Sequence, residues 1–192
     1  MKNGSNRGAK CPVEGCKRGA IVGLYQLWVT TNPCRCGYYG DTKRQCSCSE
    51  SDRKRYAGKV SGPLLDRIDI HVVMERIDFE DISLSEEKSV TSEQMRAQVI
   101  AATDIQKARY RELGINSNSQ LTPNLIKEFC SLDDEGQQLM RDAFIKWKLS
   151  ARSYHRVLKV ARTAADLDGS ENIRRNHLLE ALSYRQPDHY FK

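Results

Sequence analysis

The sequence predicts an α/β first part followed by an α-helical second part. Residues 21–31 are rich in β-branched and aromatic side chains, and residues 68–73 alternate apolar with polar, both typical of strands. From Thr91 onward, apolar residues instead recur every three or four positions in successive segments. We therefore expect short strands and a cysteine-rich loop before about residue 90, then about five helices over 91–186.

The composition narrows the class of protein. The 192 residues are 39% hydrophobic, which suffices for one or two compact domains. The 31 basic and 25 acidic residues give a net charge of +6, which is compatible with DNA contact without requiring it. No apolar run approaches the roughly 20 residues of a membrane span, and the N-terminus lacks the apolar segment of a signal peptide. We expect a cytoplasmic protein with no membrane partner, whose seven cysteines are thiols or metal ligands rather than disulfides.

Four cysteines form two close pairs around a loop that contains glycines. Cys34 and Cys36 are separated by one residue, and so are Cys46 and Cys48. Four thiolates arranged this way can close a tetrahedral zinc site. A Cys-x-Cys pair is tighter than the common Cys-x-x-Cys pair, so two interpretations stay open: a zinc site, or four reduced thiols on a loop.

One arginine stands out before the helical part. Residues 49–59 predict a short basic helix, and Gly62 and Pro63 then mark a turn that leads through a short helical turn into the predicted strand at 68–73. Arg67 falls where the turn gives way to the strand, between Asp66 and Asp69. Either it forms a local ion pair, or it is an arginine finger, a cation offered to the phosphates of a nucleotide on a neighbouring subunit.

The helices after residue 90 have clear start signals. An N-capping side chain or a proline in the first turn begins a helix, and a glycine ends one. The start signals are Thr91, Thr122 with Pro123, Asp133 and Ser150. Asp168 and Gly169 should end the fourth helix, and a last helix should run over about 174–184. We expect the apolar stripes of all these helices to be core, including Met95, Val99, Ala102 and Ile105 on the first.

Three blocks of the sequence resemble the magnesium-chelatase-like AAA+ ATPases, most closely the ComM/YifB branch associated with competence. The blocks are Asn-Pro-Cys-Arg-Cys-Gly-Tyr-Tyr-Gly-Asp at 32–41, Ser-Gly-Pro-Leu-Leu-Asp-Arg-Ile-Asp-Ile-His at 61–71, and the segment at 149–167. The resemblance covers residues 29–185. It implies that residues 29–90 are the C-terminal part, or remnant, of an AAA+ nucleotide-binding domain, and that 91–186 form the helical lid domain. Residues 1–28 match poorly, and 187–192 are a tail.

The resemblance also implies roles for matching residues. Asn32 takes the sensor 1 position, which orients the attacking water or touches the γ-phosphate. Arg67 matches the arginine finger, and Arg152 matches the nucleotide-binding sensor 2 arginine at the start of a lid helix. The complete ATPase would use ATP and magnesium. It would assemble with other AAA+ subunits into a hexameric ring and, in this branch, act on DNA as a branch-migration motor.

The sequence also departs from the family pattern. No Gly-x-x-x-x-Gly-Lys-Ser/Thr segment is present to hold phosphates, and no apolar strand ends in paired acidic residues that would bind magnesium. Arg35 stands where the family has proline. We therefore expect the C-terminal fragment of such an ATPase, inactive alone. Two alternatives are a small zinc-bearing DNA-binding module that uses the basic segment 53–59, and a protein-interaction module made of the helical domain.

Overall fold

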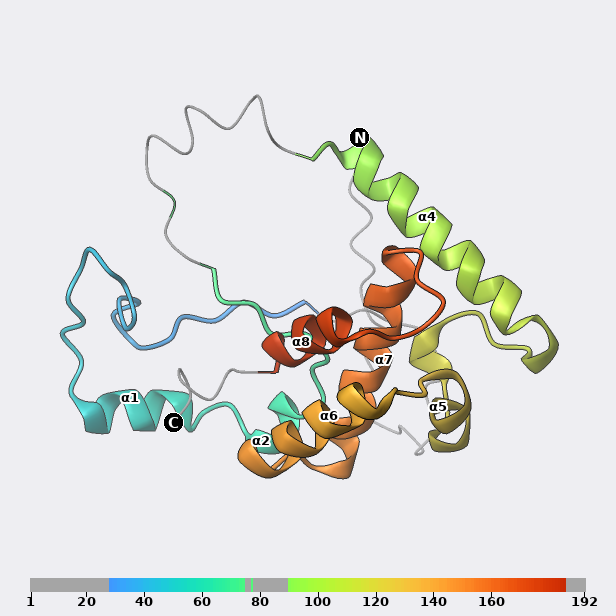
Figure 1. The fold of residues 1–192 in the computed structure, drawn as a ribbon. Helices are drawn as coiled ribbons and strands as arrows, with labels where there is room; N and C mark the ends of the chain where they lie inside the picture. Colours follow the sequence, from blue (N-terminus) through green and yellow to red (C-terminus); the bar gives the residue numbers. More distant parts are fainter. Residues whose placement is uncertain (1–27, 75–76, 78–89, 186–192) are drawn as a thin grey trace, which may run out of the picture. The chain divides into compact units, whose positions relative to one another are not determined.

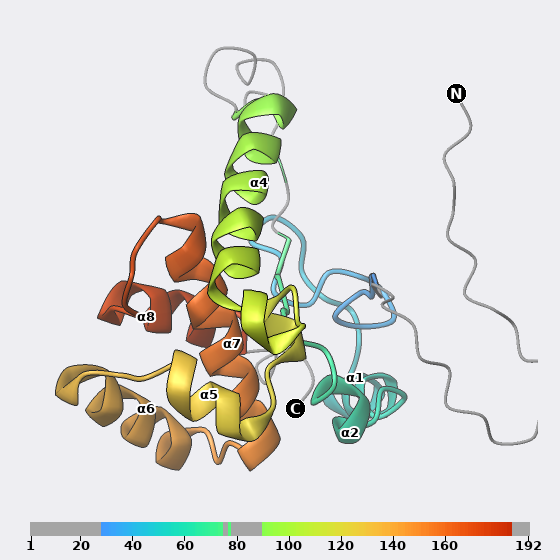
Figure 2. The ribbon, with the colours of Figure 1, turned by 90° about the vertical axis from the view of Figure 1, so that its right-hand side faces the viewer.

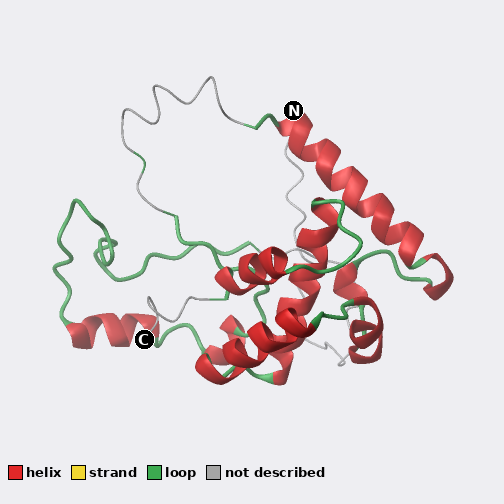
Figure 3. Ribbon diagram, viewed as in Figure 1, coloured by secondary structure: helices red, strands yellow, loops and turns green. Residues whose placement is uncertain are grey.

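The computed structural model describes residues 28–74, 77 and 90–185, and their regular secondary structure is helical throughout (Figure 3). Residues up to Asn32 belong to one unit and those from Pro33 onward to a second, which contains all the helices. The α-helices are α1 (Glu50–Ala57), α2 (Gly62–Leu65), α4 (Ser92–Arg109), α5 (Pro123–Phe129), α6 (Asp134–Lys146), α7 (Ala151–Leu167) and α8 (Arg175–Ser183) (Figure 1). Two short 3-10 helices, η1 (Arg111–Leu113) and η2 (Asn118–Gln120), lie between α4 and α5.

The predicted strands are wrong for the residues that the structure describes. Neither residues 28–31 nor residues 68–73 are strand, and residues 21–27 lie outside the described part. A strand needs a neighbour for its backbone N–H and C=O groups, and no neighbouring strand is present in the described ranges. Val29 and Val72 are each 62% exposed, so their apolar side chains are not packed as those of a half-buried strand would be. The fold class is therefore helical here, and not α/β.

Three of the four predicted helix starts are confirmed by side-chain caps, whereas α5 begins at Pro123 as predicted but Thr122 makes no capping hydrogen bond. The Ser150 hydroxyl accepts the N–H of Ser153 at 3.1 Å, and the Asp133 carboxylate accepts that of Gly136 at 2.8 Å. Thr91 forms a capping box at the start of α4. Gly169 follows the end of α7 with φ of +63°, a conformation that favours glycine. Local sequence therefore specifies most of these helix ends.

The core of the helical domain gathers around α7, which packs against α8, α4, α5 and η2 (Figure 2). Its apolar stripe is buried as predicted, with Val157, Ala161 and Ala165 fully shielded from solvent. Tyr110, just after α4, meets Phe129 of α5 edge to face, with ring centroids 5.1 Å apart. The other main buried apolar side chains are Leu121, Ile126, Met140, Leu158, Ile173, Leu178 and Leu182.

The expectation for the first of these helices, α4, fails over most of its length. Among the predicted core positions only Ala102 is buried, whereas Met95 is 50% and Val99 57% exposed. The N-terminal half of α4 extends away from the other helices (Figures 1 and 2), in keeping with the exposure of these two side chains.

A buried polar network ties the helices together around Asp166 of α7. Its carboxylate accepts hydrogen bonds from Arg109 at 2.6 and 3.1 Å, from Asn118 at 2.8 Å and from Arg162 at 3.1 Å. Tyr110 donates its hydroxyl to Asn118 at 2.6 Å. In the described residues no buried side-chain nitrogen or oxygen lacks a partner. The network is therefore fully satisfied and joins α4, η2 and α7.

No helix among the described residues is long and apolar enough to cross a membrane. The domain boundaries predicted from the sequence stay predictions.

Candidate metal centre and arginine site

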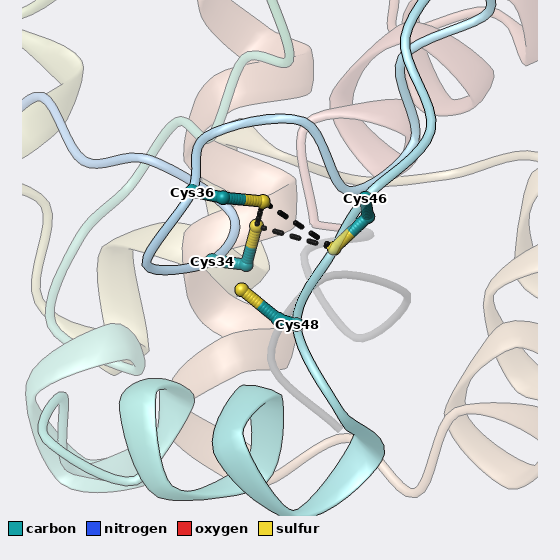
Figure 4. A group of neighbouring side chains, drawn as sticks. All are labelled: Cys34, Cys36, Cys46 and Cys48. Carbon is teal, nitrogen blue, oxygen red and sulfur yellow. Dashed lines mark hydrogen bonds between the residues drawn. The ribbon is translucent and has the colours of Figure 1, made fainter.

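The side chains of Cys34, Cys36, Cys46 and Cys48 point toward one another (Figure 4). All four sulfur atoms lie within 4.8 Å of one another. The Sγ–Sγ distances are 3.3 Å for Cys34–Cys36, 3.7 Å for Cys34–Cys46 and 3.5 Å for Cys36–Cys46. A tetrahedron with zinc–sulfur bonds of about 2.3 Å has sulfur–sulfur edges of about 3.8 Å. The four thiols are therefore already spaced to fit one metal ion.

The loop between the two cysteine pairs is shaped by glycines and by one aspartate. The N–H of Gly37 donates to the carbonyl of Cys34 at 3.1 Å, and Gly37 and Gly40 adopt φ of +85° and +88°. The Asp41 carboxylate accepts the backbone N–H groups of Lys43 at 2.7 Å and Arg44 at 3.0 Å. These turns bring the second pair of cysteines back to the first.

The thiols titrate unevenly. A backbone hydrogen bond from Tyr38 lowers the pKa of Cys36 to about 5. The pKa of Cys48 rises to about 11: a backbone hydrogen bond from Cys36 favours its thiolate, but the thiols of Cys36 and Cys34, together with desolvation, outweigh it. The protein alone thus stabilises the thiolate of Cys36 and opposes that of Cys48, mainly because hydrogen bonding between the thiols favours the protonated form of Cys48. A divalent cation would remove that opposition by neutralising the thiolates.

Two arginines contact this loop and its tyrosine side chains. The Arg53 guanidinium of α1 donates to the carbonyl of Cys48 at 2.7 Å and lies 4.7 Å from the ring centroid of Tyr39. Arg44 donates to the hydroxyl of Tyr38 at 2.8 Å. The loop is thereby joined to the first turn of α1.

Arg67 has an exposed side chain that makes no hydrogen bond or ion pair with any residue in the described ranges. The local ion pair considered from the sequence is absent, because other residues hold both neighbouring carboxylates. Asp69 pairs with Arg156 of α7 at 2.5 Å, and Asp66 pairs with Arg185 at 3.5 Å. The guanidinium of Arg67 is left available for an anion.

Arg156 and Arg185 also form hydrogen bonds with the main chain around Arg67. Arg156 donates to the carbonyl of Arg67, and Arg185 donates to that of Ile68 at 2.6 Å. The N–H of His71 donates to the carbonyl of Tyr184 at 3.0 Å. Sequence reasoning gave these arginines no role at the site. Arg156 had one available signal, since it follows Arg152 by one helical turn, whereas Arg185 lies just beyond the last helix and had none.

The other two predicted nucleotide residues are both exposed. Arg152 lies in the first turn of α7, one turn before Arg156, and its side chain has no partner among the described residues. Asn32 belongs to the first unit, where its carbonyl accepts the hydroxyl of Thr31 at 3.3 Å. The roles of Asn32, Arg67 and Arg152 stay predictions.

Comparison with known families accounts for nearly all of the described chain. Residues 89–185 match the family model described as "Magnesium chelatase, subunit ChlI C-terminal", and residues 22–82 match "Magnesium chelatase, subunit ChlI". The chain belongs to the magnesium chelatase ChlI family. This confirms the resemblance drawn from the three sequence blocks.

Several curated proteins are similar to the chain. The competence protein ComM of Haemophilus influenzae is 35% identical over 161 residues, which is 84% of this chain and 30% of that protein. The proteins named YifB of Salmonella typhimurium and Escherichia coli are 33% and 34% identical over 164 residues, or 85% of this chain and 31% of theirs. The chain spans about three tenths of the length of these relatives.

Proposed function

We propose that this chain supplies the arginine finger and the sensor arginine of a magnesium-chelatase-like AAA+ ATPase of the ComM/YifB type, as the C-terminal part of the motor. The observation that carries the proposal is the state of Arg67. Its side chain is exposed and without a described partner, while its two acidic neighbours are neutralised by Arg156 and Arg185. A guanidinium kept free in this way suits phosphate oxygens, whose geometry matches its planar fork.

In the proposed motor, Arg67 reaches the nucleotide of an adjacent subunit and stabilises charge on the transferring phosphoryl group. Arg152 contacts the nucleotide from the first turn of α7, where free backbone N–H groups also favour anions. Asn32 orients the attacking water. Because the sequence has no P-loop, another chain or segment must hold the phosphates of ATP and the magnesium ion. We expect the assembly to be a cytoplasmic ring that remodels DNA.

The test compares this chain alone with the chain mixed with a partner. The 192-residue protein should show no ATP turnover alone. It should raise the turnover of a full-length relative whose own matching arginine is replaced by alanine. Arg67→Ala should abolish that rise, whereas Arg141→Ala, at an exposed arginine of α6, should leave it unchanged. Turnover by the chain alone that Arg152→Ala removes would contradict the proposal.

We also propose that the four-cysteine cluster, Cys34, Cys36, Cys46 and Cys48, holds one structural zinc ion. Support comes from the sulfur spacing and from a loop with few apolar side chains to stabilise it. Elemental analysis of the purified protein should give about one zinc per chain. Cys46→Ser should lose the metal, and Cys130→Ala, at a buried cysteine outside the cluster, should keep it. Metal-free wild-type protein that refolds with an unchanged loop would refute this assignment.

The alternative of a DNA-binding module built on α1 receives less support. Lys54 pairs with Glu50 at 2.6 Å and Arg55 pairs with Asp52 at 3.7 Å, so acidic neighbours compensate much of the basic charge of this helix. We therefore assign DNA contact to the assembled motor. Tight, salt-dependent binding of a short duplex by this chain alone would favour the module instead.

A further inference from the structure

We propose that Arg156 and Arg185 are positioning residues for Arg67: they keep its guanidinium free and fix the main chain that carries it. What Arg67 then does rests on the proposed function above. Residues 66–71, the docked segment, contact the helical domain. This docking does not rest on the proposed function, because it follows from contacts within the chain.

Arg67 lies between two carboxylates that could compete with a phosphate for its guanidinium. Asp66 and Asp69 are close enough in sequence to Arg67 for either carboxylate to pair with it. Instead Asp69 is bound by Arg156, and Asp66 is bound by Arg185 and by the hydroxyl of Ser153 at 3.3 Å. Removing either outside arginine would release a carboxylate beside Arg67 and draw its guanidinium away from a phosphate.

Arg156 and Arg185 also hold the main chain that carries Arg67. The carbonyls of Arg67 and Ile68 are held by Arg156 and Arg185, and the N–H of His71 is held by Tyr184. The Arg185 side chain is only 7% exposed, so its charge is stable there only while its donors are occupied. The backbone around Arg67 is therefore fixed from the start of α7 and from the end of α8.

This arrangement links the two arginines that the proposed function assigns to nucleotide. Arg152 and Arg156 lie one turn apart in α7, on the same face of the helix. A shift of the first turn of α7 when Arg152 meets a phosphate would be carried by Arg156 to the backbone of Arg67. The helical domain would thus couple nucleotide contact at Arg152 to the position of Arg67, which acts on the nucleotide of the adjacent subunit.

The docking is tested without any activity. In the 192-residue chain, Arg156→Gln and Arg185→Gln should each raise the hydrogen-exchange rate of the His71 amide about tenfold, because the hydrogen bond to Tyr184 opens more often. Asp69→Asn, which leaves α7 intact, should raise it less. Arg175→Gln breaks an ion pair with Glu135 elsewhere on the helical domain and should leave the rate unchanged. Unchanged exchange in both arginine variants, with far-UV circular dichroism still native, would overturn the inference.

The charge competition is tested in the mixed ATPase assay. Arg156→Gln should lower kcat about tenfold with little change in the KM for ATP, as a misplaced catalytic group does. Adding Asp69→Asn to that variant should restore part of the rate, because the competing carboxylate is gone although the carbonyl of Arg67 still lacks its donor, and a merely structural role predicts no such rescue. A double variant as slow as the single one would refute the competition. If wild type and Arg67→Ala give equal rates, the proposed function fails and with it the role of the finger, while amide exchange still decides the docking.

Discussion

Asp166 is the single residue on which the helical domain should depend most. Its side chain is fully buried and receives hydrogen bonds from Arg109, Asn118 and Arg162. Asp166→Ala should lower the free energy of unfolding by about 3–5 kcal/mol, because Arg162 would keep a buried charge without its partner. Urea unfolding followed by circular dichroism measures this. Asp104→Ala, at an exposed carboxylate that pairs with Lys107, should change stability by less than about 1 kcal/mol.

His71 should make the stability of the docked segment depend on pH. Burial, then the nearby charge of Arg185, lowers the pKa of His71 below 6.5, despite the opposing effects of the backbone at Ile68 and Leu65 and of Asp66. The folded state therefore favours the neutral ring. Its contribution is fully present above about pH 6.5 and is lost as the pH falls through the lowered pKa, because the unfolded chain binds the proton more readily.

The measurement for His71 is the urea midpoint of wild type and of His71→Gln over about pH 5 to 8. The two curves should converge as the pH falls, since the variant has no ring to protonate. Parallel curves over this range would show that His71 has no such effect.

At the residue scale, the sequence indicated that four cysteines can come together, but it did not predict the buried hydrogen-bond network around Asp166. Cys34, Cys36, Cys46 and Cys48 come as two pairs on a short loop, so their convergence follows from local spacing. Asp166 and Arg109 are 57 residues apart, and nothing local distinguishes them from surface charges. Pairing of that kind depends on how the helices pack, which a single sequence does not encode in its spacing.

Among the elements, α7 is the one whose start should be most sensitive to substitution. Ser150 caps it, and the first turn carries Arg152 and also Ser153, whose hydroxyl donates to Asp66 of the docked segment. Ser150→Ala should lower the free energy of unfolding by about 1 kcal/mol, since one backbone N–H loses its partner. Thermal unfolding measures this. Ser183→Ala, at the exposed end of α8, provides the matched control and should leave the midpoint nearly unchanged.

The helices were predictable and the strands were not, for one physical reason. A helix satisfies its backbone within a single segment, so caps such as Ser150, Asp133 and Thr91 are sufficient signals. A strand satisfies its backbone only with a neighbour. Residues 68–73 have the alternation of a strand, yet the described chain gives them Tyr184 and Arg185 as partners instead. Likewise, the stripe on α4 predicted burial that its position does not provide.

At the scale of the whole molecule, the cysteine loop and the helical domain should respond separately to removal of the proposed zinc ion. The hydrophobic core lies within residues 110–182 and includes none of the four clustered cysteines. A strong chelator should therefore increase protease cleavage within residues 34–48, because the loop would lose the metal–sulfur bonds that join its two cysteine pairs.

In the same chelated sample, the thermal midpoint of the helical signal should stay within a few degrees of its original value. Equal loss of both signals would show that the two parts unfold together. Cys46→Ser should reproduce the chelator's effect without any reagent.

The network at Asp166 has a further consequence, for the order of events when the chain folds. It joins partners 48 and 57 residues apart, whereas α7 and α8 are neighbours in sequence and pack directly on each other. Closing long loops is slow, so we expect the α7–α8 pair to form first and the Asp166 contacts after the rate-limiting barrier. Asp166→Asn should then speed unfolding while hardly slowing refolding in stopped-flow experiments. The Asp166 carboxylate would thus form its contacts late in folding and would mainly set the unfolding rate, and with it the lifetime of the folded domain.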